Sequence, residues 1–148
     1  MRLISHRGNQ NGKDENLENN PTYVLEAIAA GYNVEVDVWS YNHLWFLGHD
    51  NPQYSISGEF LLDPNIWCHA KNIEAMREML RIGPHCFWHE NDKITLTSQG
   101  YIWTFPGEPL TDLSICVLPK ITSTKISQCA GVCSDEIAKY NKTYNSNI

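Results

Sequence analysis

The sequence predicts an α/β protein, a compact and trimmed TIM-like (β/α) barrel in which several helices are shortened or missing. Eight short apolar runs that suit strands follow one another along the chain, and at least two segments between them show helical spacing. The chain has 148 residues, whereas barrels of this kind usually need about 200 or more. The later connections are therefore expected to be loops or single turns.

The first half of the chain has the clearest pattern. Asn20-Pro21 predicts the start of a helix, because proline suits the first helical turn, and Gly31 predicts its end. The strict alternation of valine with other residues over 33–39 predicts a strand. In this half, strands are expected at residues 3–5, 33–39 and 44–47, with a loop rich in asparagine and charge at 9–20.

The second half repeats the alternation with shorter connections. Residues 73–82 show helical spacing of apolar side chains, and Gly83-Pro84 predicts the end of that helix. Residues 1–138 are expected to form one domain, followed by a frayed tail at 139–148 that is rich in Asn and Lys. Strands are expected at residues 66–71, 85–89, 101–105, 114–118 and 130–133.

Composition excludes several functions. The formal net charge of -6 and the scattered lysines and arginines argue against a nucleic-acid-binding surface. No apolar run approaches the roughly 18 residues of a membrane span. Met1–Ile4 runs straight into His6, so we expect no signal peptide and a cytoplasmic protein. The five cysteines are then expected to be free thiols, with Cys129 and Cys133 a weak candidate metal pair. Oligomeric state is not predictable from the sequence.

Glu35 and Asp37 are the strongest physical signal of a site. They are two apart on an alternating strand, so their side chains point to the same face. Two carboxylates side by side are costly unless a cation or a proton lies between them. The alternative is an ordinary strand with one solvated polar face, and periodicity alone does not choose between the two.

Two further polar groups directly follow expected strands. Arg7 of His6-Arg7 suits bidentate contact with phosphate oxygens, and His6 suits proton transfer near neutral pH. His49-Asp50 follows residues 44–47 in the same way. Each pair alone would more often be a polar turn. Their common place at strand ends is what predicts a site, because barrels build active sites at the carboxyl ends of their strands.

Together these residues resemble the glycerophosphodiester phosphodiesterase family. The resemblance lies in four motifs in the family's order over residues 3–50, and it is thinner beyond. His69-Ala70-Lys71 stands where the family has a glutamate-x-lysine strand, and Ser134-Asp135 resembles a threonine-aspartate near its last strand. The four motifs of the first third are His6-Arg7-Gly8, Glu18-Asn19, Glu35-Val36-Asp37 and His49-Asp50.

The resemblance implies a barrel with one divalent metal ion at its mouth and a small phosphodiester as substrate, in lipid metabolism. One histidine would accept the proton of an attacking hydroxyl and the other would protonate the leaving alcohol, through a cyclic phosphate. The implied roles are general acid and base for His6 and His49, phosphate contact for Arg7 and Lys71, metal ligation for Glu35 and Asp37 with His69 at the third ligand position, and support for Glu18. Glu90 is a further supporting candidate because of its residue type and its place after the expected strand 85–89.

His69 is the main departure from the family, which has a carboxylate ligand at that position. The resemblance implies Mg²⁺ or Ca²⁺, which prefer oxygen ligands, whereas an imidazole ligand suits Mn²⁺ or Zn²⁺. Glu90, His89 or a water molecule are alternative ligands if His69 is not one.

Three functional hypotheses follow. The first is metal-dependent hydrolysis of a glycerophosphodiester-like substrate. The second is an inactive relative that binds a phosphorylated ligand or a protein partner, as the short barrel and the lost carboxylate suggest. The third is a lyase that stops at the cyclic phosphate.

Overall fold

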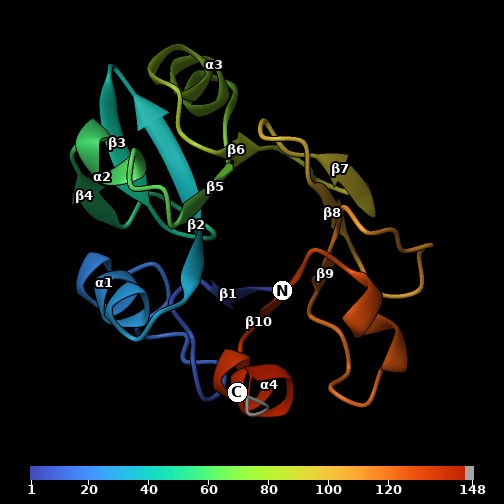
Figure 1. Cartoon of the computed structure of the whole chain (residues 1–148). Helices are drawn as coiled ribbons and strands as arrows, with labels where there is room; N and C mark the ends of the chain where they lie inside the picture. Colours follow the sequence, from blue (N-terminus) through green and yellow to red (C-terminus); the bar gives the residue numbers. More distant parts are fainter. Residues whose placement is uncertain (146–148) are drawn as a thin grey trace.

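The computed structural model describes residues 1–145, and Figure 1 shows a sheet that curls around a central space with helices outside it. The strands are β1 (Arg2–His6), β2 (Asn33–Tyr41), β3 (Leu44–Leu47), β4 (Tyr54–Ile56), β5 (Ile66–Ala70), β6 (Cys86–Phe87), β7 (Ile94–Leu96), β8 (Ile102–Thr104), β9 (Ser114–Val117) and β10 (Gly131–Ser134). The helices are α1 (Pro21–Ala29), α2 (Gly58–Leu61), α3 (Ile73–Ile82), α4 (Ile137–Asn145) and the 3-10 helix η1 (Thr124–Gln128).

The curled part of the sheet has eight strands in the order β6-β5-β2-β1-β10-β9-β8-β7. All neighbouring pairs in this order are parallel except β7 with β8, which is antiparallel. The sheet is therefore mostly parallel, as the alternation of strands and helices predicts. The carboxyl ends of seven strands consequently meet at one rim.

The curled sheet does not close into a regular barrel in residues 1–145. No ladder joins the edge strands β6 and β7. Two hydrogen bonds join β6 to the turn after β7 instead, from the Ser98 amide to the Cys86 carbonyl (2.8 Å) and from the Cys86 amide to the Ser98 hydroxyl (2.9 Å). The short connections between β6 and β10 explain this form, because they leave no room for helices like α1 and α3.

The third expected strand, 44–47, forms as β3 but is not a strand of the curl. It pairs antiparallel with residues 38–41 at the C-terminal end of β2, and β4 pairs antiparallel with β3 (Figure 1). Residues 33–38 of β2 pair with β1 and β5. Strand β2 is thus shared between the curled sheet and a projecting three-stranded extension.

Alternation along the strands sorts apolar side chains into an inner and an outer layer. The inside of the curl is filled by Ile4, Trp67, Phe87, Trp103, Ile115, Val117 and Cys133. The outer face near α1 and α3 buries Val34, Val36 and Val38 with Cys68 and Ala70. Since Glu35 and Asp37 alternate with these valines, both carboxylates point inward, as the spacing predicts.

Both expected helices form with the expected ends. The Asn20 side chain accepts a hydrogen bond from the Thr22 amide and Pro21 occupies the first turn of α1. The Asn72 side chain caps α3 through the Ala75 amide, and Gly83 ends it in the left-handed conformation. Among residues 1–145, no helix has the length and apolarity that a membrane span requires.

The expected frayed tail is instead mostly helical. Helix α4 spans Ile137–Asn145, while residues 146–148 lie outside the described part of the chain. Ile137 and Tyr140 are both buried, and the Tyr140 hydroxyl donates to the Pro119 carbonyl at 2.8 Å. Ile137 and Tyr140 are three residues apart and therefore lie on one face of α4, by which the helix packs against the rest of the protein.

Candidate metal-centred active site

A cavity of about 450 Å³ opens at the rim where the carboxyl ends of the parallel strands meet. Trp103, Phe105, Val117 and Leu118 form an apolar wall on the β8–β9 side. Seven of the nine site residues expected from the sequence also line this cavity, while Asp37 and Glu18 are buried directly behind it. The seven are His6, Arg7, Glu35, His49, His69, Lys71 and Glu90.

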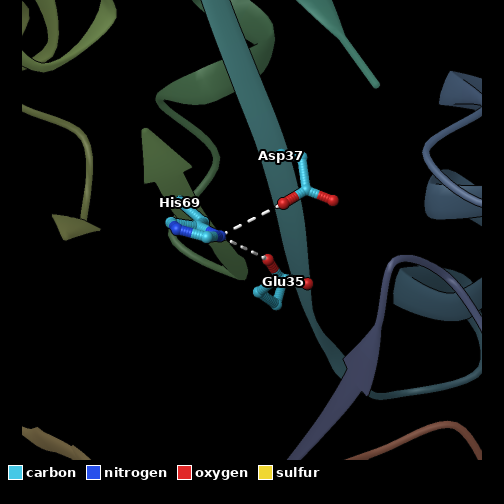
Figure 2. Close-up of side chains that lie close together, drawn as sticks. All are labelled: Glu35, Asp37 and His69. Atoms are coloured by element: carbon cyan, nitrogen blue, oxygen red, sulfur yellow. Dashed lines mark hydrogen bonds and ion pairs between the residues drawn. The ribbon is translucent and has the colours of Figure 1, made fainter. Parts of the chain in front are cut away.

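Glu35, Asp37 and His69 form a buried cluster at the base of the cavity (Figure 2). One ligand atom from each residue lies within 4.8 Å of the others. The parallel register of β2 and β5 sets Asp37 beside His69, and the register of β1 and β2 sets His6 beside Glu35. Two carboxylates and an imidazole at this spacing suit one divalent ion.

The two carboxylates differ in how their charge is compensated. Burial and the neighbouring Asp37 raise the pKa of Glu35. Burial would also raise the pKa of Asp37, but the hydrogen bond from His69, the charge of Arg7 and the hydrogen bond from Asn19 lower it well below its usual range. The Glu35 Oε2 atom is buried without a hydrogen-bond partner among residues 1–145. A cation bound beside Glu35 would supply the missing charge.

The hydrogen bonding of His69 points the same way. Its Nε2 lies 3.1 Å from the His89 carbonyl, which can only accept a hydrogen bond. Nδ1 of the same ring faces two further acceptors, Asp37 Oδ1 at 3.1 Å and Glu35 Oε1 at 3.8 Å. A neutral ring has one N–H, so it can satisfy only one of its two sides. A second proton on the ring or a cation beside Nδ1 satisfies both, and a backbone carbonyl on the far nitrogen is the usual support of a metal-bound histidine.

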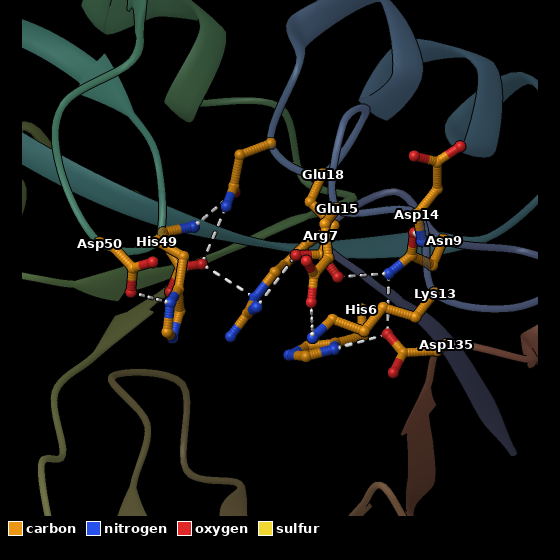
Figure 3. A network of polar contacts seen from close by, with 12 residues as sticks. His6, Arg7, Asn9, Lys13, Asp14, Glu15, Glu18, His49, Asp50 and Asp135 are labelled. Carbon is orange, nitrogen blue, oxygen red and sulfur yellow. Dashed lines mark hydrogen bonds and ion pairs between the residues drawn. The ribbon is translucent and has the colours of Figure 1, made fainter.

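His6 is oriented by Asp135, at the end of β10. Nδ1 of His6 donates to Asp135 Oδ1 at 2.7 Å (Figure 3). Its Nε2 lies 3.7 Å from Glu35 Oε2. Burial lowers the pKa of His6, but the Asp135 hydrogen bond and the charge of Glu35 outweigh it, so the net shift is upward. The Asn9 amide donates to both Asp135 (2.8 Å) and Glu18 (2.9 Å) and joins the two carboxylates.

Arg7 is held by two acidic residues. Its Nη1 donates to Glu18 Oε2 at 3.1 Å and its Nε lies 3.0 Å from Asp37 Oδ2. Lys71 Nζ adds a more distant cation, 4.0 Å from Asp37 Oδ1. Glu18 thus supports the site through Arg7 and Asn9 and is not part of the metal cluster.

The backbone after β1 is bent to present Arg7. Arg7 has a φ of 56° and Gly8 a φ of 95°, both in the left-handed region. A Cβ on Gly8 would lie 2.7 Å from Cδ1 of Tyr23, so glycine is required here for space as well as for conformation. The His-Arg-Gly motif therefore has a structural reason for its third residue.

His49 reaches the cavity by a route that the sequence does not predict. Because β3 runs antiparallel to β2, its end returns from the projecting extension to the rim, where the Gly48 amide donates to the Asp37 carbonyl (3.1 Å). The expectation that His49 follows a strand of the barrel is therefore wrong, although its place on the cavity is right. The His49 side chain is 44% exposed and its Nδ1 lies 2.7 Å from Asp50 Oδ1.

The alternative third ligands and the candidate cysteine pair lie elsewhere. Glu90 is exposed on the cavity wall, outside the three-residue cluster, and His89 contributes its carbonyl and a ring stacked on His69 with centroids 4.4 Å apart. Cys133 packs inside the curl, and Cys129 packs outside it. The partner of Cys129 is Cys116, with the two sulfurs 2.8 Å apart, so Cys129 and Cys133 do not form the candidate metal pair.

Asn9 and Asp135 are the residues of this network that the sequence reasoning gave no role. Asp135 had two signals, its place directly after an expected strand and the resemblance of Ser134-Asp135 to a threonine-aspartate, but neither predicts its contact with His6. Comparison with known proteins adds no further constraint: no family model, no curated protein and no solved structure matches this chain.

Proposed function

We propose that this chain is a metal-dependent phosphoric diester hydrolase that acts on glycerophosphodiester-like substrates, as its motifs' resemblance to glycerophosphodiester phosphodiesterases implies. The observation that supports this best is the shared cavity. Two histidines, two cations and the Glu35–Asp37–His69 cluster converge on one space from four separate parts of the chain. Such convergence suits phosphoryl transfer, where positioning and charge supply most of the catalysis.

Glu35, Asp37 and His69 would hold the divalent ion, which when bound would neutralise charge on the phosphate oxygens. Mg²⁺ and Ca²⁺ are implied by the resemblance, and Mn²⁺ or Zn²⁺ by the imidazole of His69. Arg7 and Lys71 would bind the same phosphate from the cavity wall. Asp37 lies 3.0 Å from Arg7 and 4.0 Å from Lys71 and partly compensates both positive charges. A bound phosphate would supply further negative charge beside them.

His6 and His49 have the same kind of hydrogen-bond partner, and this arrangement suits proton transfer. In each, Nδ1 lies 2.7 Å from an aspartate oxygen, Asp135 for His6 and Asp50 for His49. The aspartate fixes the ring and leaves Nε2 as the atom for exchange with substrate. One Nε2 would accept the proton of the attacking hydroxyl, and the other would protonate the leaving alcohol oxygen as the P–O bond breaks.

Hydrolysis of glycerophosphocholine with and without EDTA tests the proposal. We expect a divalent-ion-dependent release of choline that falls at least about 100-fold in His6→Ala, the size usual for a lost acid or base. Glycerophospho-p-nitrophenol then separates the two roles, because nitrophenolate needs no protonation to leave. The variant that lacks the general acid recovers on this substrate and the other does not. Unchanged activity in His6→Ala and His49→Ala would refute the mechanism.

Analysis of the phosphorus products distinguishes hydrolysis from lysis, since a lyase would accumulate the cyclic phosphate.

A non-catalytic binding protein is the second candidate, favoured by one observation: His49 is 44% exposed, on a loop that follows an antiparallel strand. Phosphate and metal binding without turnover of any diester would support that function instead.

A further inference from the structure

A second, mainly apolar cavity of about 290 Å³ lies on the outer side of β8 and β9. Its walls come from the end of β8, from β9 and from η1. The apolar contributions are made by Phe105, Leu110, Cys116, Val117, Pro119 and Ile126. Neither the motifs nor the proposed chemistry uses this space.

The outer cavity adjoins the catalytic cavity through the rim of the sheet. Trp103 lines only the catalytic cavity and Cys116 only the outer one, as expected for inward and outward positions on neighbouring strands. Phe105 and Val117, at the carboxyl ends of these strands, line both cavities. A chain that leaves the catalytic cavity over these two side chains enters the outer cavity without crossing the sheet.

The border of the outer cavity is positively charged. Lys120 and Lys125 are exposed there. Glu108 is the acidic residue of the lining, and Lys93 already pairs with it at 3.7 Å. In a chain of net charge -6, two lysines beside an apolar cavity favour a ligand that is both apolar and anionic.

The opposite flank of the phosphate site is polar. A cavity of about 380 Å³ shares Arg7 and His49 with the catalytic cavity, and its other walls include Lys13, Asp50 and Gln53. The proposed phosphate position therefore has hydrogen-bonding groups on one side and apolar side chains on the other.

We propose that the outer cavity binds an alkyl chain of an asymmetric phosphodiester, whose hydroxyl-rich alcohol occupies the polar cavity beside Arg7. The inference rests on the proposed function and specifies its substrate class as an anionic amphiphile. Burial of each methylene is expected to raise affinity about fourfold until the cavity is full.

Glycerophosphodiesters of ethanol, butanol and hexanol test this, because they differ only in alkyl length. We expect kcat/KM to rise along the series in the wild type. Leu110→Asp should abolish the rise and leave the ethanol ester unaffected, with Leu110→Ala as a milder variant if the aspartate impairs folding. Leu113→Asp is the matched control, since Leu113 lies on the same connection but is 50% exposed and lines neither cavity.

Calorimetric binding of ethyl phosphate and hexyl phosphate gives a readout that needs no turnover. Tighter binding of hexyl phosphate, lost in Leu110→Asp, supports the cavity even if no diester is hydrolysed, in which case only the proposed function fails. Hydrolysis of all three diesters at equal kcat/KM, with equal binding of the two phosphates, would overturn the inference and leave the proposed function standing.

Discussion

Nδ1 of His69 faces the Asp37 carboxylate at 3.1 Å while Nε2 of the same ring lies 3.1 Å from a backbone carbonyl. Both partners are acceptors and a neutral imidazole has one N–H, so one of the two contacts is unsatisfied unless the ring has a second proton or a cation lies beside Nδ1. A proton and a divalent ion would then compete for the position between Nδ1 and the carboxylates, which ties the electrostatics of the fold to metal binding.

Divalent metal is expected to stabilise the protein. At a free concentration about 100 times its Kd, an ion bound only by the folded state adds about 2.7 kcal/mol, or a rise in Tm of about 5–10 °C for a chain of this size. Differential scanning calorimetry with Mn²⁺, Zn²⁺, Mg²⁺ and Ca²⁺ after EDTA treatment measures it. Glu35→Gln should remove the rise and exposed Glu136→Gln should keep it. A rise of equal size in both variants would contradict the assignment of the ligands.

Removal of each carboxylate should have opposite effects on the metal-free protein. Asp37 compensates Arg7 and His69 and exchanges two 2.9 Å hydrogen bonds with Asn19, so Asp37→Asn should lower the free energy of unfolding by about 3 kcal/mol. Glu35 is less well compensated, with its nearest cationic partners His6 and His69 at 3.7 and 3.8 Å, so Glu35→Gln should leave that energy unchanged or raise it by up to about 1 kcal/mol. Urea unfolding in EDTA compares them, and equal losses would show that the two carboxylates are equivalent.

His85 should destabilise the fold as the pH falls. Burial, with the charge of Arg2, lowers the pKa of His85 to about 4, and its Nε2 lies 2.7 Å from the Thr97 hydroxyl. Below pH 6.5 the unfolded chain binds a proton that the folded chain refuses, so this part of the stability is lost as pH falls from 6.5 towards 4. Between pH 7 and 5 the loss is about 1–2 kcal/mol.

Chemical unfolding at the two pH values measures the total loss, to which His89 also contributes because burial lowers its pKa to about 4. His85→Gln should reduce that total by the share of His85. His43→Gln, at an exposed histidine, should leave the loss unchanged. The same pH dependence in wild type and His85→Gln would assign it to other groups.

The thiols of Cys116 and Cys129 should form a disulfide under a mild oxidant such as diamide. Their sulfurs are 2.8 Å apart and both residues are buried. Two thiols lose two protons and two electrons to the diamide, and the closed loop should stabilise the fold by about 3 kcal/mol.

Intact mass and non-reducing peptide mapping detect the disulfide. Cys116→Ser should prevent it, whereas Cys68→Ser should not, because Cys68 packs in a different layer. Oxidation that links any other pair would contradict the prediction.

Local pattern predicts the parts of the site that depend on one strand. Glu35 and Asp37 share a face because the strand period is two, and the structure confirms it. The direction of β3 depends on its pairing with β2, which no local pattern contains, so its orientation was missed. The His6–Asp135 contact spans 129 residues, so it too depends on the order of strands in the sheet.

The average composition of a segment gives a wrong prediction where a few buried side chains determine its structure. The polar residues after 138 suggest a frayed tail, yet Ile137 and Tyr140 are buried and fix α4. The reverse holds for Glu90, whose residue type suits a metal ligand but whose side chain is exposed on the cavity wall. Whether a side chain joins the cluster depends on where its strand places it, and β5 places His69 beside Asp37.

Strand β2 pairs with β1, β3 and β5 and supplies both carboxylates of the cluster. Its amides at Val34, Val36 and Val38 are in completely buried residues. Amides of such central strands are expected to be among the slowest to exchange with deuterium. If the carboxylate pair lies in the last segment to unfold, metal exchange at this site should proceed through the rim and not through local unfolding of its ligands.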